Sequence, residues 1–308
     1  MNAQLETMTA NTGPASSTAT RPFYWSIRRE IWENRSLYLA PLIVAGVIIL
    51  GFMFTAVSLP QRRRAVLLLD DPARTQAAIE MPYSMAAMMI MFTAFLVGVF
   101  YCLDTLHGER RDRSILFWKS LPVSDFTTVL SKITIPLVVL PAISFAVIIA
   151  TQVMIFLISS VVLLANGISP MTTLAHTNLP QGVLILLYGL IALSLWHTPT
   201  YGWMLLVSAW ARRAAFLWAV LPAVAISFFE RVVFGTNYFP NFLKHRFLNW
   251  ADEAFAFRRA SHGTPILDSL SQLTPGRYLA TPGLWLGLIF AAICVATAVR
   301  LRRSRGPI

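Results

Sequence analysis

The chain has 308 residues, of which 56% are hydrophobic and 13% are charged, and its formal net charge is +11. Soluble domains carry about 25% charged residues, so this composition excludes an ordinary soluble domain and favours a chain surrounded by lipid. The basic residues stand at the ends of apolar runs, as in membrane proteins, and we therefore expect no nucleic-acid partner.

The N-terminal segment is polar and lacks the basic and apolar regions of a signal peptide. We expect residues 1–20 to form a disordered cytoplasmic tail and residues 21–308 to form one membrane domain.

Apolar residues then recur every four positions on one helical face, namely Phe23, Ile27 and Ile31. Trp25 and Trp32 flank that face, while Arg29 and Glu33 lie opposite. This pattern predicts an amphipathic elbow helix, which either anchors at the membrane interface or also touches a cytoplasmic partner.

Six apolar runs are long enough to cross a bilayer, near residues 37–59, 84–103, 133–158, 183–209, 214–234 and 282–299. The third and fourth are separated by Asn166-Gly167 and by 178–182, and Arg212-Arg213 predict a tight turn before the fifth. The expected fold is an all-α integral membrane protein with six transmembrane helices.

Orientation follows from the basic residues, because cytoplasmic loops are enriched in Lys and Arg. With the N-terminus inside, 15 of the 25 Lys and Arg residues are cytoplasmic. The run 62–64, three arginines just outside the first span, opposes this assignment. We expect both termini in the cytoplasm.

The loop 104–132 predicts a short cytoplasmic amphipathic helix. A charged helix end precedes the apolar run 115–118, Pro122 stops the helix, and Ser124 or Asp125 is placed to cap the next one. Such a helix either docks a partner or lies on lipid.

The same loop resembles that of a known family. Glu109, Ser114, the stretch Leu121-Pro122-Val123-Ser124 and Lys132 are similar to the first cytoplasmic loop of ABC-type export permeases, the membrane subunits of the second exporter class. That family has Gly-Thr where this chain has Arg113-Ser114. The resemblance covers about 25 residues in motif and most of the chain in layout, including the elbow helix and the six spans.

The resemblance implies a transmembrane permease subunit in the bacterial cytoplasmic (inner) membrane. It implies a second permease copy or a related six-span chain, and an ABC ATP-binding subunit docked on the loop helix. The implied coupling residues are Glu109, Arg110, Arg113, Ser114, Ile115, Leu116, Phe117, Trp118, Leu121 and Pro122. The chain has no Gly-Lys dipeptide and hence no P-loop, so ATP and Mg belong to the partner subunit and no cofactor is expected here.

Polar groups within or near the spans are candidates for a pathway or gate. His197 lies in the fourth span, where it either packs near Pro199 or contacts substrate. Glu230 and Arg231 lie near the outer end of the fifth span, as an interfacial pair or a gate. The segment 235–281 has helical apolar periodicity and is expected outside, on the membrane surface or capping a dimer.

Other classes of function remain open from the residues alone. We find no His-Glu-x-x-His pair and no Gly-x-Ser-x-Gly elbow, so no catalytic or metal-ligating residues are assigned and we expect no enzyme. The alternatives to an export permease are a membrane sensor or immunity protein without a motor, and a polytopic membrane enzyme.

Overall fold

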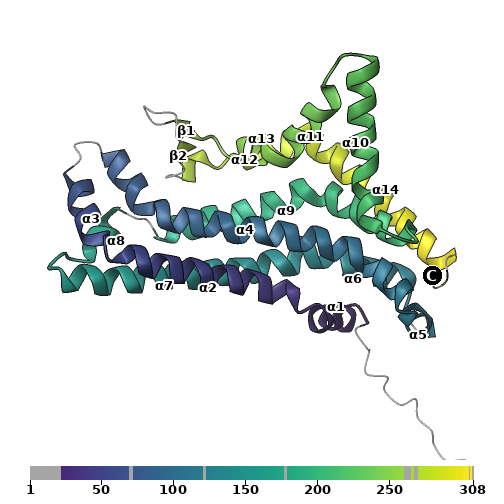
Figure 1. Ribbon diagram of the computed structural model, residues 1–308, viewed down its shortest axis with the longest axis horizontal. Coiled ribbons are helices and arrows are strands. Elements are labelled where there is room, and N and C mark those ends of the chain that lie inside the picture. Colours follow the sequence, from purple (N-terminus) through teal and green to yellow (C-terminus); the bar gives the residue numbers. More distant parts are fainter. Residues whose placement is uncertain are drawn as a thin grey trace, which may run out of the picture.

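The computed structural model describes residues 22–68, 72–120, 123–176, 179–259, 265–266, 270–304 and 306. They are almost entirely helical, and Figure 1 shows long helices lying side by side in a bundle. Six stretches of helix in the described residues are long and apolar enough to cross a membrane. The predicted all-α integral membrane fold is therefore confirmed, and the chain is a multi-pass membrane protein.

The six candidate spans are built from the following elements: α2 (Ser36–Ala56), α4 (Pro72–Arg111), the continuous run of α6 (Asp125–Thr134), η1 (Ile135–Val139) and α7 (Leu140–Ala165), α9 (Leu179–Trp210), α10 (Ala215–Val233) and α14 (Pro282–Ser304). Each contains or closely matches one predicted apolar run. The second and third helices extend well beyond their apolar runs, and this extra length carries the charged residues discussed below.

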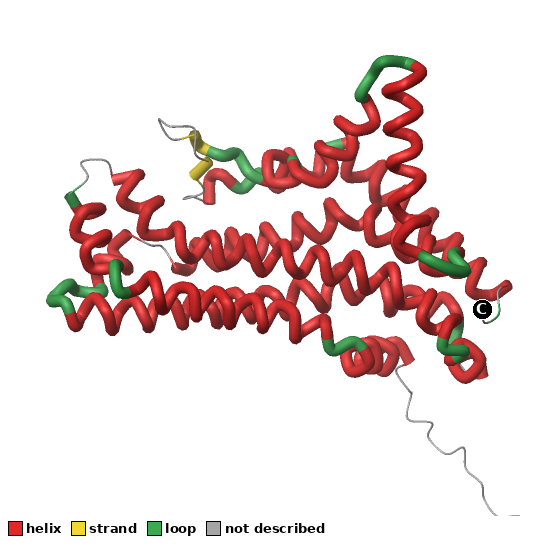
Figure 2. The backbone as a smooth tube through the Cα atoms, in the orientation of Figure 1, coloured by secondary structure: helices red, strands yellow, loops and turns green. Residues whose placement is uncertain are grey.

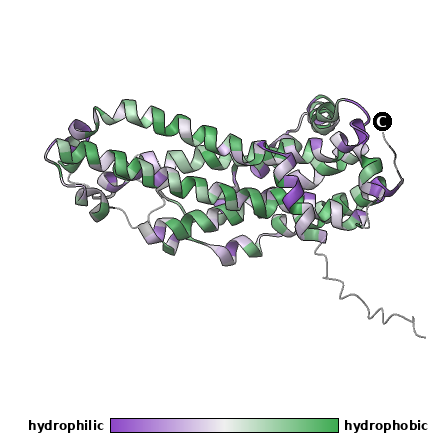
Figure 3. Cartoon of the chain, turned by 90° about the horizontal axis from the view of Figure 1, so that it is seen from below, coloured by the Kyte–Doolittle hydropathy of each residue, from purple (hydrophilic) through white to green (hydrophobic). Residues whose placement is uncertain are grey.

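Apolar side chains hold the bundle together in two main layers. Near one end, Leu37, Tyr101, Ile135 and Leu205 pack together from four helices. Further along, a second cluster joins α2, α4, α7 and α9 through small and branched residues such as Ala45, Ile90, Ile148 and Leu190. Figure 3 shows apolar residues along most of the length of the long helices and polar residues gathered near their ends, the distribution expected of helices exposed to lipid.

Helix ends follow local sequence signals. The Ser124 side chain accepts a hydrogen bond from the Thr127 backbone N–H at 3.0 Å and caps α6, as predicted. Gly167 adopts a φ of 73° immediately after α7, confirming the predicted break there. The turn between α9 and α10 contains Arg212-Arg213 and ends at Ala214, whose φ of 49° is unusual for a non-glycine residue. Figure 2 shows these short connections between the helices.

A π-helical turn, η1, joins α6 to α7. It follows Lys132 by three residues and contains Pro136, which has no backbone N–H to donate. A π turn holds more residues than an α turn, so it displaces the helix locally from regular geometry.

The bundle has two chemically different ends. α1 (Pro22–Glu33), α5 (Ser114–Ser120) and the C-terminus lie at one end, and α3 (Leu59–Leu67) and α8 (Met171–His176) lie at the other (Figure 1). We call the first the α1–α5 end.

The arginine run at the opposite end has a structural role. Arg63 is 5% exposed, and its Nη2 donates to Thr173 Oγ1 of α8 at 3.2 Å. Arg64 donates to the carbonyl of Asn166 at 3.1 Å. Burial lowers the pKa of Arg63. These contacts tie α3 to the chain that follows α7, which gives a physical reason for arginines at this end despite the opposite trend elsewhere.

The segment 235–281, which was predicted outside on the membrane surface or capping a dimer, packs in part against α9. It contains α11 (Tyr238–Leu248), α12 (Trp250–Ala254), the paired two-residue strands β1 (Arg258–Arg259) and β2 (Pro265–Ile266), η2 (Leu270–Gln272) and α13 (Pro275–Ala280). Trp196 of α9 is buried among Ala254, Phe255 and Tyr278. Figure 1 shows α10 projecting away from the bundle and α11 returning to it.

Candidate functional site

A group of charged residues is buried at the α1–α5 end, and it begins with Glu30 of α1. Ile27 and Ile31 pack against the main core cluster and carry Glu30 between them into the interior, where it is 1% exposed. Its carboxylate lies 2.7 Å from Lys132 Nζ and 2.6 Å from Arg29 Nη2. The Tyr101 hydroxyl donates to the same carboxylate at 2.7 Å. The Glu30 side chain thus joins α1 to both α4 and α6.

Lys132 of α6 is 2% exposed and links two carboxylates. Its Nζ lies 2.7 Å from Glu30 Oε1 and 3.0 Å from Glu109 Oε1, and it donates to Thr105 Oγ1 at 2.8 Å. An ammonium group has three N–H donors. Three oxygens therefore match its full capacity, which makes the burial of this cation tolerable.

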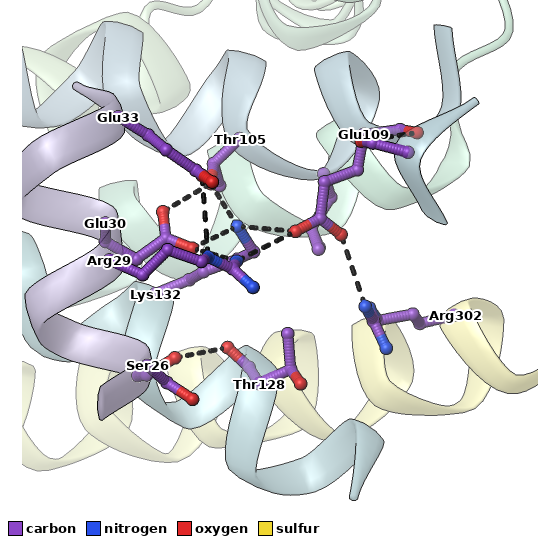
Figure 4. A network of polar contacts seen from close by, with 12 residues as sticks. Ser26, Arg29, Glu30, Glu33, Thr105, Glu109, Thr128, Lys132 and Arg302 are labelled. Atoms are coloured by element: carbon purple, nitrogen blue, oxygen red, sulfur yellow. Dashed lines mark hydrogen bonds and ion pairs between the residues drawn. The ribbon is translucent and has the colours of Figure 1, made fainter. Parts of the chain in front are cut away.

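Glu109, near the end of α4, connects this pair to α14. Its Oε1 also lies 3.3 Å from Arg29 Nη2, and its Oε2 lies 3.2 Å from Arg302 Nη2. Arg302 in turn pairs with Asp125 at the start of α6. Figure 4 shows Arg29, Lys132 and Arg302 converging on the carboxylates from three different helices. We call these six residues, Arg29, Glu30, Glu109, Asp125, Lys132 and Arg302, the ionic cluster.

The ionic cluster is electrically balanced, with three carboxylates and three cations. Burying an isolated charge is costly, whereas a paired and hydrogen-bonded one is tolerated. Burial alone would raise the pKa of Glu30, but the charges of Lys132 and Arg29 outweigh it and lower that pKa to about 2. Burial opposes the charge of Arg29 as well, yet Glu30 and Glu33 raise its pKa. Both side chains are therefore charged at neutral pH.

Helix α5 rests on this cluster. Arg29 stacks on the ring of Trp118, with 3.8 Å between the guanidinium carbon and the ring centroid. Ile115 is 1% exposed, whereas Leu116 is 59% and Phe117 is 60% exposed. The inner face of α5 is thus fixed to the bundle and its outer face is open.

The turn before α5 forms without glycine. Arg113 occupies the position where the family resemblance has Gly, and it adopts a left-handed φ of 58°. A non-glycine residue in this conformation is strained by roughly 1–2 kcal/mol. The turn before α5 is therefore formed at a conformational cost that a glycine would avoid.

The structure divides the predicted coupling residues into two groups. Three of them, Glu109, Arg110 and Ile115, are buried. Arg110 Nη1 donates to the carbonyls of Ala209 and Ala211 at 2.8 and 3.1 Å. Ser114 Oγ donates to the Glu109 carbonyl at 3.4 Å. Arg113, Leu116 and Phe117 are exposed, and Trp118 is half-buried. Leu121 and Pro122 lie outside the described residues.

The three candidates for a pathway or gate have separate surroundings. His197 is 2% exposed, its Nδ1 lies 2.9 Å from the Leu193 carbonyl, and its ring packs 4.6 Å from that of Phe95. Glu230 accepts hydrogen bonds from Thr236 Oγ1 and from the backbone N–H groups at the start of α11. Arg231 is exposed. The described contacts give His197 a packing role and Glu230 a capping role, and they do not bring the three together.

Three members of the ionic cluster, Glu30, Asp125 and Arg302, were not predicted from the sequence as site residues, and Arg29 was predicted on the opposite face of its helix. Glu30 lies on the helical face of Ile27, and a carboxylate on an apolar face was the available signal. Arg29 was assigned to the outward face, but its long side chain reaches back to Glu109. Asp125 and Arg302 gave no local signal, because their pairing depends on how α6 and α14 meet.

The ionic cluster joins four helices, α1, α4, α6 and α14, through buried ion pairs. Within the described ranges, no three His, Cys, Asp or Glu side chains are grouped so as to hold a metal ion. Comparison with protein-family models, curated proteins and solved structures found no match to this chain.

Proposed function

We propose that this chain is the transmembrane permease subunit of an ATP-driven ABC exporter, and that it couples to a separate ATP-binding subunit. The observation that carries the proposal is the position of α5. Its outer face presents Leu116 and Phe117 at the α1–α5 end, while its inner face rests on charged residues that join α1, α4, α6 and α14.

This arrangement suits the transmission of force. Pushing α5 moves Trp118 against Arg29, and Arg29 is ion-paired with Glu30 and Glu109. Lys132 and Arg302 extend the same pairs to the third and sixth spans. Charge-assisted contacts are stronger than neutral ones, so we expect a displacement of α5 to reach several spans together.

The remaining parts of the proposal concern partners and location. ATP and Mg bind to the partner subunit, and this chain performs no hydrolysis. A second permease copy, or a related six-span chain, completes the pathway. Helix α10 offers this partner an apolar surface, since only 6% of the residues in the apolar stretch of α10 are buried. We place the protein in the bacterial cytoplasmic membrane, with the α1–α5 end in the cytoplasm.

The test is capture of an ATPase. The tagged chain, solubilised from its native membrane in mild detergent, should retain a P-loop protein with ATPase activity. Replacing Leu116 and Phe117 together by Ala should lower the affinity for that subunit about thirtyfold, as expected when about 2 kcal/mol of interface energy is removed. Phe126→Ala is the matched control, because Phe126 is 54% exposed on the neighbouring helix α6; it should leave capture unchanged.

Two results would contradict the proposal. One is wild-type protein that never retains an ATPase. The other is a Leu116→Ala, Phe117→Ala double variant that retains it as well as wild type does while its thermal unfolding is unchanged.

A further inference from the structure

The outward face of α1 carries a row of exposed aromatic residues. Tyr24, Trp25 and Trp32 are 55%, 56% and 65% exposed. Ile27, Glu30 and Ile31 on the other side of the helix hold it to the bundle. The outward face is therefore fixed in place and unoccupied by the described part of this chain.

Arg28 lies in the middle of this row. Its guanidinium carbon is 5.2 Å from the ring centroid of Trp25 and 4.5 Å from that of Trp32. One turn of helix separates Arg28 from each tryptophan, so all three side chains share one face. We call Trp25, Arg28 and Trp32 the Trp–Arg–Trp face.

The two adjacent arginines of α1 have opposite environments. Arg29 lies within 4 Å of Glu30, Glu33 and Glu109. Arg28 has no carboxylate of the described residues within that distance, and its guanidinium lies over the two neutral indole rings, which leave its charge uncompensated. A guanidinium stacked between rings keeps its N–H groups free at the edge, where they form a planar fork that fits phosphate oxygens.

The orientation of α1 places this face at the membrane surface. Figure 1 shows α1 nearly end-on, so it lies across the long axis of the bundle, immediately before the apolar helix α2. A helix that lies flat where a span begins is at the level of lipid headgroups, where tryptophan rings are favoured.

We propose that the Trp–Arg–Trp face binds the headgroup of an anionic phospholipid. Arg28 contacts the phosphate, and the two indoles lie among the headgroups and the upper acyl chains. The charge of the face is complementary to such a lipid. The inference does not depend on the proposed transport function.

The experiment uses the full chain, purified in detergent without any ATP-binding subunit. Native mass spectrometry measures binding of phosphatidylglycerol and, separately, of phosphatidylcholine. Wild type should prefer phosphatidylglycerol. Arg28→Gln should weaken phosphatidylglycerol binding about fivefold, the typical contribution of one cation at an anionic surface, and leave phosphatidylcholine binding unchanged. Arg28→Lys should have an intermediate effect, because it keeps the charge and loses the planar stack.

Arg212→Gln is the matched control, since Arg212 is an exposed arginine at the same end of the bundle; it should change the preference much less. Trp25→Leu with Trp32→Leu removes the stack by a second route and should also weaken the preference. The proposal is overturned if Arg28→Gln, with unchanged thermal unfolding, keeps the wild-type preference. It is equally overturned if that variant weakens binding of phosphatidylglycerol and of phosphatidylcholine to the same extent.

Discussion

The side chain of Glu30 is 1% exposed and yet ionised, because Lys132 and Arg29 lie within ion-pair distance of its carboxylate. Removing one partner of a buried pair leaves the other charge uncompensated, which typically costs about 3–5 kcal/mol. We therefore expect Glu30→Gln to lower the free energy of unfolding by about 3 kcal/mol. The measurement is thermal or denaturant unfolding in detergent.

The neighbouring Glu33 provides the control for this variant. Its side chain is 49% exposed and pairs with Arg29 at 3.5 Å. Exposed pairs of this kind contribute well under 1 kcal/mol, so Glu33→Gln should have little effect. Equal effects of the two variants would show that burial in the ionic cluster contributes nothing.

The ionised state of Glu30 also predicts a dependence on pH. Its pKa is about 2 in the folded chain, against an ordinary value of 4.5. The stability that this group contributes is therefore fully present above pH 4.5 and is lost as the pH falls toward 2. Unfolding measured from pH 6 to pH 2 should show a steeper loss of stability for wild type than for Glu30→Gln. Parallel curves would contradict the assigned ion pairs.

At the scale of elements, α11 is held by a close fit between α9 and α14. Arg246 of α11 is 8% exposed, donates to the carbonyls of Trp196 and Gly283, and stacks on the Trp196 ring at 4.4 Å. A Cβ atom at Gly287 would lie 2.5 Å from Arg246 Nη2 and 2.8 Å from Pro199 Cγ. The glycine is required here because the guanidinium and the proline ring fill the space.

Gly287→Ala should therefore destabilise the docking of α11 by about 1–3 kcal/mol, the usual cost of overpacking. Increased cleavage of the segment 235–281 by added protease, together with a lower unfolding temperature, would be the readout. Gly283→Ala is the control one helical turn away, since its nearest neighbour would be Thr281 Cγ2 at 3.9 Å. If both variants behave like wild type, the close fit described here is wrong.

Elements and contacts differ in how far the sequence predicts them. The length of an apolar run reports directly on the bilayer, so all six spans were predictable. Local signals such as Ser124 and Gly167 likewise mark helix ends. The pairing of Glu109 with Arg302, by contrast, joins residues 193 positions apart and depends on the approach of two helices. The packing of segment 235–281 on α9 was unpredictable for the same reason, because its periodicity shows an apolar face without showing what covers it.

At the scale of the whole molecule, the two ends of the bundle should face opposite sides of the membrane. Phe117 is 60% and Met171 is 66% exposed, at opposite ends, and the native Cys102 and Cys294 are buried. We expect a membrane-impermeant maleimide to label Met171→Cys in intact cells and Phe117→Cys only after permeabilisation. The reverse pattern would invert the orientation and exclude docking of a cytoplasmic subunit on α5.

The exposure of α10 leads to a prediction about assembly. Of the residues in the apolar stretch of α10, 6% are buried, compared with 44% in the apolar stretches of the second and fourth spans. A contact with a second copy would cover it, so Phe228→Cys on α10 should form cross-linked dimers in native membranes when a short bis-maleimide is added. Val161→Cys on α7, equally exposed at 68% against 69% for Phe228, is the control. Equal cross-linking at both positions would argue against a specific contact.

The π-helical turn Ile135–Val139 fixes the rotational phase of α6 relative to α7. Each residue of an α-helix advances the chain by about 100°. If all five residues of this turn formed regular α-helix, the one residue that the π turn accommodates in excess would advance the chain by about 100° and turn Lys132 away from Glu30. A chain lacking Val138, which is 60% exposed, can rebuild this turn as regular α-helix and keep Lys132 facing Glu30. The ionic cluster therefore depends on the number of residues in one turn of the third span as well as on the identity of its own members.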